Sequence, residues 1–105
     1  MVDSVEIYNQ GVDHMKRNEY ELAIEAFTQA LELDPELAHA HNARAAARTL
    51  RGDVDEGLAD SHEAIRLDPK EPKFYHTRGL VYREIGDKAK AEDDFAKAEA
   101  LGLTF

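Results

Sequence analysis

The segment at residues 20–35, YELAIEAFTQALELDP, returns twice at a spacing of 34 residues, and this repetition restricts the fold more than any other feature of the sequence. A fixed period of this length is typical of repeat proteins, in which one unit cannot bury its apolar face alone and stacks on the next. We therefore predict one domain over residues 1–105 made of three units, at about residues 4–37, 38–71 and 72–105. The positions in register include Ala30, Ala64 and Ala98, and Leu33, Leu67 and Leu101.

The first unit shows the pattern of two helices joined by a tight turn. Asp3 and Glu6 have the spacing of a capping box, in which each side chain accepts a hydrogen bond from the other residue's backbone amide. Basic residues at 16–17 followed by Asn18 are typical of a helix end, and Asn18 with Glu21 repeats the capping pattern. A connection this short makes the two predicted helices antiparallel neighbours.

Aspartate and proline mark further helix starts. Asp34 is expected to cap the next helix, with Pro35 in its first turn. In the second unit a helix is predicted at residues 54–67, where Asp53 forms a capping box with Glu56.

The second unit carries smaller side chains than the other two. Gly57 and Ser61 stand where the first unit has Ala23 and Phe27. Glycine inside a helix costs about 1 kcal/mol relative to alanine, whereas small residues let helices approach closely. We therefore expect this unit to be either the softest or the most tightly packed, with Phe27 and its third-unit equivalent Phe95 in the core.

Arg44 and Arg48 lie four residues apart, on one face of the helix predicted at residues 38–50. Exposed ion pairs usually contribute little to stability. We expect these arginines to be solvated or to form surface salt bridges, and not to contact a ligand.

The third unit begins at Pro72, which suits the first turn of a helix, and turns at Gly86. Its last helix keeps the inner small and aromatic positions but has polar residues on the outer face. A terminal unit needs such a face because nothing covers it. We expect the array to end here, with Leu101, Leu103 and Phe105 folding back over the end. The polar outer positions are Lys88, Glu92 and Glu99.

The charge balance limits the classes of partner. The chain has 22 acidic and 13 basic residues, a formal net charge of -9, which repels nucleic acids and anionic membranes. It has no cysteine and no apolar run of the ~20 residues that cross a bilayer, and residues 1–10 are acidic where a signal peptide is basic. We therefore expect a soluble cytoplasmic protein that binds neither nucleic acid nor membrane.

A series of glycine, small, aromatic and proline residues recurs in register with the period. Its members are Gly11, Gly79, Ala23, Phe27, Ala30, Pro35, Ala64 and Pro69. This series, with two predicted helices per unit, resembles the tetratricopeptide repeat family over essentially the whole chain. The resemblance implies an all-α fold: a right-handed superhelical α-solenoid of three helix-turn-helix units, with six antiparallel helices. The family's frequent tryptophan is missing, and Ser61 replaces the large aromatic of the second unit.

The resemblance also implies that the first helices of the units line a concave groove, which in this family commonly holds a peptide or helix of another protein. Amide side chains in such a groove can pair with a peptide backbone, and Lys73 with Arg83 can meet an acidic residue. Tyr8 and Val12 offer apolar pockets; the alternative is that both only pack between units and that Asn42 is solvated. The expected partner-binding residues are Tyr8, Asn9, Val12, His39, Asn42, Lys73, His76, Thr77 and Arg83.

One branch of the family grips the C-terminal carboxylate of heat-shock chaperones with Lys, Asn, Asn, Lys and Arg. Of the five matching places in this sequence, only Lys73 agrees. A single ammonium cannot reproduce a multidentate carboxylate grip, so we do not expect this role. The five places hold Tyr8, Val12, Ala43, Lys73 and Thr77.

The histidines do not form a metal-ligand pattern. Two ligands on one helix face need a spacing of three or four, whereas His39 and His41 are two apart. His39 and His76 can approach across units, but no third ligand obviously joins them. Since the sequence also has no glycine-rich phosphate loop and no nucleophile elbow, we expect no metal, no cofactor and no enzymatic activity.

Two functions therefore remain. The first is a non-catalytic adaptor or scaffold module that binds a peptide or helix of a partner protein in its groove. The alternative is structural self-association through unit edges or the apolar tail at residues 101–105, with the chain a monomer or a weak homo-oligomer.

Overall fold

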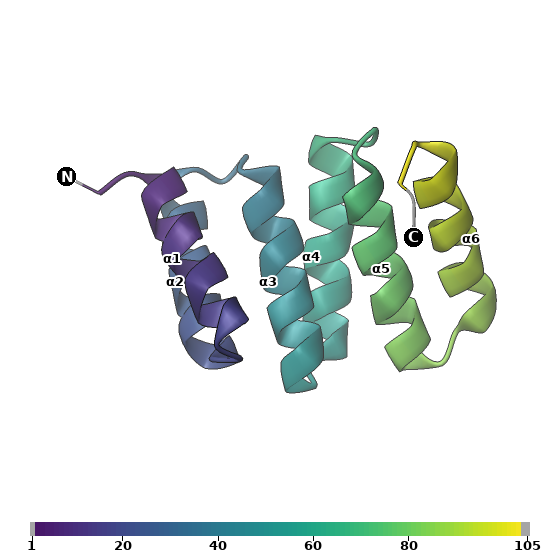
Figure 1. Cartoon of the computed structure of the whole chain (residues 1–105), viewed down its shortest axis with the longest axis horizontal. Coiled ribbons are helices and arrows are strands. Elements are labelled where there is room, and N and C mark those ends of the chain that lie inside the picture. The colour runs from purple at the N-terminus through teal and green to yellow at the C-terminus, as the bar shows by residue number, and fades with distance from the viewer. Residues whose placement is uncertain (1, 104–105) are drawn as a thin grey trace.

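The computed structural model describes residues 2–103 and shows six antiparallel helices in three consecutive pairs, with no strand in that range (Figure 1). The principal extents are 43 × 26 × 22 Å, and the first and last helices lie at opposite ends of the long axis. The predicted all-α fold with two helices per unit is therefore confirmed. The helices are α1 (Ser4–Lys16), α2 (Tyr20–Leu33), α3 (Ala38–Arg51), α4 (Val54–Leu67), α5 (Pro72–Ile85) and α6 (Lys88–Ala100).

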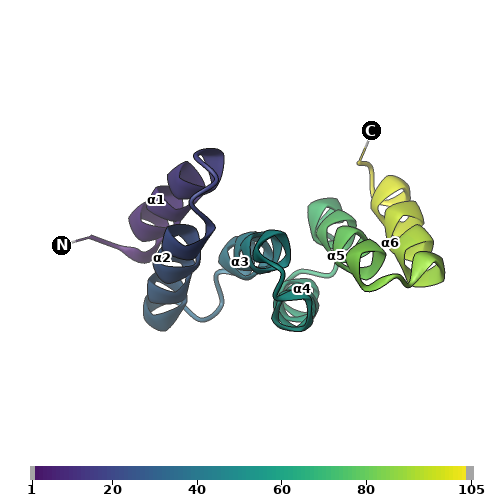
Figure 2. The ribbon, with the colours of Figure 1, turned by 90° about the horizontal axis from the view of Figure 1, so that it is seen from below.

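The helices form two layers. Each helix contacts the next along the chain, and in addition α1 contacts α3 and α3 contacts α5. In the described part of the chain, α2, α4 and α6 make no contact with one another. Because the first helices of the units lie closer together than the second helices, the array curves with α1, α3 and α5 on its inner side (Figure 2).

Only one of the predicted helix caps in the first unit forms. Asp3 caps α1, since its Oδ1 accepts a hydrogen bond from the backbone amide of Glu6 at 2.9 Å. The cap predicted for α2 is wrong. Asn18 has a φ of 60°, outside the helix, and its Oδ1 accepts a hydrogen bond from the Tyr20 hydroxyl, so that Glu19 precedes the helix without capping it.

The caps predicted for Asp34 and Asp53 are also wrong, because each side chain binds a different donor. Asp34 accepts a hydrogen bond from the amide of Glu36, and α3 begins only at Ala38, beyond the proline that we expected in its first turn. Asp53 accepts from the Arg51 guanidinium at 2.6 Å and caps no amide of α4. Short polar side chains take the donor that the local geometry offers, so spacing in the sequence does not decide the cap.

A phenylalanine ring lies against a glycine in the first and third units. Phe27 is fully buried, and a Cβ on Gly11 would lie 2.4 Å from its ring. Phe95 lies in the same way against Gly79, where the corresponding distance is 2.6 Å, although this ring is only partly buried. Only glycine leaves room for a ring at this approach. The predicted core role is confirmed fully for Phe27 and in part for Phe95.

The second unit makes the same helix contact with smaller side chains. Ser61 is fully buried at the place of the ring, and Ala45 stands at the place of the glycine. Gly57 brings the α4 backbone against α3, since a Cβ there would lie 2.3 Å from the Thr49 Oγ1. Of our two expectations for this unit, tight packing is the one that the structure shows.

Phe74 is a core residue that the repeat pattern does not reveal. Its equivalent in the second unit is Ala40, so the period gives no sign of a ring here. Phe74 is fully buried, and its ring meets the His39 ring edge-on with 5.0 Å between centroids. This contact joins α5 to α3.

The segment after α6 turns back onto that helix. Gly102 has a φ of 110°, and the Leu103 amide donates to the Ala98 carbonyl at 3.0 Å, which satisfies the end of α6. Leu101 and Leu103 are partly buried, whereas the role expected of Phe105 lies outside the described residues. The predicted polar outer positions Lys88, Glu92 and Glu99 are all exposed.

Truncation of Phe27 tests the ring-on-glycine contact. Phe27→Ala should lower the free energy of unfolding by about 3 kcal/mol or more, because it leaves a cavity between α1 and α2. The control is Leu22→Ala on the same helix, where the side chain is 45% exposed and the loss should stay below about 1 kcal/mol. Urea unfolding measures both, and similar losses would show that Phe27 is not core.

A double-mutant cycle tests the compensation in the second unit. Ser61→Phe alone should destabilise by about 1–3 kcal/mol, since the ring meets the Cβ of Ala45. Combined with Ala45→Gly, the two changes should couple favourably by about 0.5 kcal/mol or more. Strictly additive losses in urea unfolding would contradict this account of the glycine positions.

Candidate functional site

The predicted partner-binding residues all lie on the inner layer of helices. Those of the first unit are on α1, His39 and Asn42 are on α3, and the other four are on α5. Four of the nine side chains are exposed, and the remainder are partly buried. The exposed ones are Asn9, His39, Lys73 and Arg83.

Tyr8 and Val12 contribute mainly to packing in the first unit. Both contact the buried cluster that includes Phe27, and the Tyr8 and Phe27 ring centroids lie 5.7 Å apart. Burial raises the pKa of the Tyr8 hydroxyl above its ordinary value of 10.0. The packing alternative that we left open for these two residues therefore agrees with the geometry.

Asn42 is partly buried, and its side-chain oxygen does not face solvent. Its Oδ1 is buried, and no donor among residues 2–103 reaches it. Asn42 is the repeat equivalent of Tyr8 and His76, each of which contacts a phenylalanine ring. In the second unit the residue equivalent to that phenylalanine is Ser61. Two polar residues thus occupy the repeat positions that hold an aromatic pair in the first and third units, and no hydrogen bond joins their side chains in the described chain.

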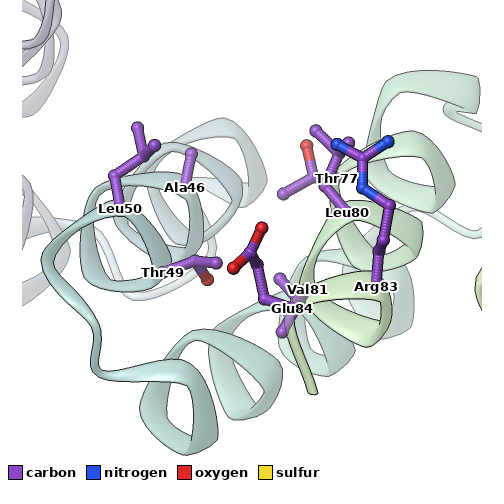
Figure 3. Close-up of a pocket in the computed structure, with 8 residues that line it drawn as sticks. All are labelled: Ala46, Thr49, Leu50, Thr77, Leu80, Val81, Arg83 and Glu84. Carbon is purple, nitrogen blue, oxygen red and sulfur yellow. The ribbon is translucent and has the colours of Figure 1, made fainter. Parts of the chain in front are cut away.

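A cleft of about 270 Å³ opens on the inner side, between the last turns of α3 and α5 (Figure 3). The α3 wall is low because Ala46 and Thr49 stand where the third unit has Leu80 and Arg83. Of the predicted site residues, the structure brings Thr77 and Arg83 to this cleft. The lining residues are Ala46, Thr49, Leu50, Thr77, Leu80, Val81, Arg83 and Glu84.

A second hollow of about 280 Å³ lies between α5 and α6. Its residues are His76, Leu80, Arg83, Phe95 and Glu99. Leu80 and Arg83 line both hollows, so this part of α5 forms a ridge between them. The His76 and Phe95 ring centroids lie 5.5 Å apart at the second hollow.

The residues Leu50, Val81 and Glu84 were missed as site residues in the sequence. Leu50 is 60% exposed and forms a rim of the first cleft, whereas Val81 is buried at its base. The sequence feature that could have revealed this cleft is the small size of Ala46 and Thr49 on α3, because small residues beside the larger Leu80 of α5 leave a gap. Lys73, Asn9 and His39 line neither hollow.

Arg44 and Arg48 form salt bridges, which is one of the two outcomes that we expected, but the carboxylate that they share is buried and not at the surface. Arg44 donates from Nε and Nη2 to the two carboxylate oxygens of Asp60, at 2.9 and 2.8 Å, and from Nη1 to the Thr28 hydroxyl at 3.2 Å. Arg48 donates to the same carboxylate at 2.8 Å, and the Asp60 side chain is only 6% exposed. Each arginine is therefore held in place and does not serve as a free cation.

The same arrangement recurs 34 residues later in the third unit. Arg78 donates to both oxygens of Asp94 at 2.8 Å, and its Nη1 lies 3.2 Å from the His62 Nδ1. His62 is the repeat equivalent of Thr28. In both units the arginine therefore joins its own helix pair to the preceding one.

His41 belongs to the Asp60 cluster. Its Nε2 lies 2.9 Å from the Pro35 carbonyl oxygen, and its Nδ1 lies 3.8 Å from an Asp60 oxygen. The Asp60 carboxylate raises the pKa of His41 above 6.5, against the opposing effect of burial. Burial would raise the pKa of Asp60, but contact with His41 and Arg44 lowers it overall.

Neither a metal cluster nor a membrane span is found in the described chain. Among residues 2–103, no group of three or more His, Asp or Glu side chains could hold a metal ion. None of the described helices is long and apolar enough to cross a bilayer.

Comparison with known proteins matches the first and third units to family models and most of the chain to curated relatives. A family model described as tetratricopeptide repeat matches residues 6–37, and another with the same description matches residues 72–101. The chain is 38% identical over 100 residues to Tetratricopeptide repeat protein 36 of Homo sapiens, with 91% of this chain and 53% of that protein covered. It therefore spans about half the length of the curated relatives that it first matches.

Two solved structures are similar in both fold and sequence. The Sgt2 TPR domain from Aspergillus fumigatus has a TM-score of 0.89 at 30% identity, covering 93% of this chain and 65% of that one. The second TPR of Spaghetti (RPAP3), bound to the HSP90 peptide SRMEEVD, has a TM-score of 0.89 at 27% identity, covering 94% and 92%.

The raised pKa of His41 predicts a pH dependence of stability. A group whose pKa is higher in the folded state stabilises fully below its unfolded pKa, here 6.5, and this contribution disappears as the pH rises through the folded value. The comparison variant is His41→Tyr, because the equivalent Tyr75 hydroxyl donates to the Pro69 carbonyl and does not titrate in this range.

Urea unfolding of both proteins between about pH 5.5 and 8.5 measures the effect. The free energy of unfolding of the wild type, relative to the variant, should fall as the pH rises above 6.5. A difference that stays constant or increases with pH would show that Asp60 does not favour protonated His41.

Proposed function

The chain belongs to the tetratricopeptide repeat family, and we propose that it acts as a non-catalytic binding module that holds a peptide or helix of a partner protein on its inner face. The observation that carries this proposal is the open cleft between α3 and α5, with apolar walls and charged residues at its rim. Apolar concavities with a few polar groups are where proteins commonly bind ligands. We also propose that the module serves as an adaptor or scaffold in the cytoplasm.

We further propose that the binding mode differs from the carboxylate clamp. Among the five clamp places, Tyr8 and Val12 pack against the first-unit core, and Ala43 packs there too. Thr77 offers a hydroxyl where the clamp has a guanidinium, so Lys73 is the only cation among them. The peptide SRMEEVD is bound by the similar Spaghetti domain, and it provides a direct comparison ligand.

Self-association remains the second candidate. Its proposed tail includes residues 104–105, which lie outside the described residues. The exposed charges on the outer face of α6 do not favour stacking of further copies at that end.

The test uses peptides selected from a displayed random library on the wild-type protein. The variant is Leu80→Ala, which removes an apolar wall of the cleft, combined with Lys73→Glu on the same helix. It should weaken the selected peptides by about tenfold or more, equal to ~1.4 kcal/mol. Lys88→Glu makes the same charge change on the outer face and should leave the affinity within about twofold. SRMEEVD should bind more weakly than the selected peptides.

Thermal melting checks that the variants remain folded. Equal affinity of the selected peptides for the wild type and the double variant would place the binding surface elsewhere. A Lys73-dependent affinity for SRMEEVD that exceeds that of the selected peptides would contradict the exclusion of the clamp.

A further inference from the structure

The cleft between α3 and α5 combines apolar walls with one carboxylate. Leu80 and Val81 of α5 face Ala46 and Leu50 of α3 across it. Figure 3 shows the Glu84 side chain reaching into the space between the two helices, toward the wall that carries Thr49. An occupant of this cleft therefore meets aliphatic surface on two sides and a negative charge between them.

Glu84 has no charged partner of its own in the described chain. No ion pair or hydrogen bond joins its carboxylate to another residue within 2–103, although most arginines of the chain are paired. The neighbouring Arg83 does not neutralise it, because consecutive residues of a helix do not face each other. In Figure 3 the Arg83 guanidinium lies on the Thr77 side of the cleft and points away from the carboxylate.

These features discriminate between three kinds of occupant. A purely apolar side chain would remove water from the Glu84 carboxylate without replacing its hydrogen bonds, which is unfavourable. An acidic side chain would be repelled by Glu84 and by the net charge of -9, and the Arg83 guanidinium that could attract it points away from the Glu84 carboxylate (Figure 3). A side chain with an aliphatic stem and a cationic end covers the apolar walls and pairs with the carboxylate.

We propose that this cleft is a binding site for a lysine side chain of the partner, with its methylene stem between Leu50 and Leu80 and its ammonium ion at Glu84. The inference rests on the proposed function, and it adds the chemistry of the ligand. A lysine brings a longer aliphatic stem to the apolar walls than an arginine does, four methylene groups against three, although a guanidinium would also pair with the Glu84 carboxylate. The preferred partner segment is then basic, in contrast to the acidic peptide held by the Spaghetti domain.

The third unit alone supplies the acid at this position of the repeat. The equivalents of Glu84 are Lys16 in the first unit and Leu50 in the second. The equivalents of the small cleft residue Thr49 are Met15 and Arg83, which are larger. A small residue on one inner helix, Thr49, and an acid on the next, Glu84, therefore occur together only between the second and third units of the described chain.

The test is a titration of isotope-labelled protein, followed by amide chemical shifts, with three matched probes. The probes are the N-acetyl, N-methylamide derivatives of lysine, norleucine and glutamate. Norleucine keeps the aliphatic stem of lysine and lacks the ammonium. The lysine probe should shift the amides of Ala46, Thr49, Leu80 and Glu84, with an affinity about fivefold higher than that of the norleucine probe, equal to roughly 1 kcal/mol.

Glu84→Gln keeps the shape of the side chain and removes its charge. In this variant the lysine and norleucine probes should bind equally, whereas Glu92→Gln, on the exposed outer face of α6, should leave the difference unchanged. The proposal is overturned if norleucine or glutamate binds the wild type as tightly as lysine. It is also overturned if Glu84→Gln leaves the lysine preference intact, or if the lysine shifts lie outside the cleft.

The result of the probe titration does not depend on the result of the peptide-affinity test of the proposed function. If selected peptides need Leu80 and Lys73 but the lysine probe shows no preference over norleucine, the binding module is supported and the lysine site is refuted. If the lysine probe binds as described but the double variant binds every selected peptide as tightly as the wild type does, the proposed function is refuted and the lysine site is supported.

Discussion

The structure depends on close contact between helix backbones within each unit. In the first and third units a phenylalanine ring packs against a glycine of the facing helix. A Cβ on Gly11 would lie 2.4 Å from the Phe27 ring, and a Cβ on Gly79 would lie 2.6 Å from the Phe95 ring. In the second unit Gly57 makes an equally close approach from the other helix. Because one helix pair is too small to bury its apolar surface alone, these pairs are stable only when stacked. The arginines at 44 and 78 then join each pair to the preceding one.

The curvature and the cleft follow from the same packing. Contacts between α1 and α3, and between α3 and α5, bring the inner helices together, while the outer helices of the described chain stay apart. The small residues of α3 permit this approach and also leave its wall low beside α5. The small side chains that make the second unit tight within itself therefore also leave a cleft toward the third unit.

The sequence predicts the helices well and the side-chain partners poorly. The helix expected at residues 54–67 coincides with α4 (Val54–Leu67), because period, turn residues and apolar pattern all agree there. Caps at Asn18 and Asp53 fail since nearby donors compete for the same oxygen atoms. The buried Asp60 was missed because its partners lie on another helix, although the 34-residue recurrence of Arg and Asp was visible in the sequence. The exposed site residues gave no such signal, since the register places a residue in the groove without showing where its side chain points.

The proposed surface for another polypeptide is the inner layer of helices, α1, α3 and α5. Hydrogen exchange of the backbone amides, measured with and without a peptide selected on the wild-type protein, tests this most directly. Slower exchange is expected in α3 and α5 around the cleft, with α4 and α6 unchanged on their outer faces. Slower exchange confined to the outer helices would contradict it.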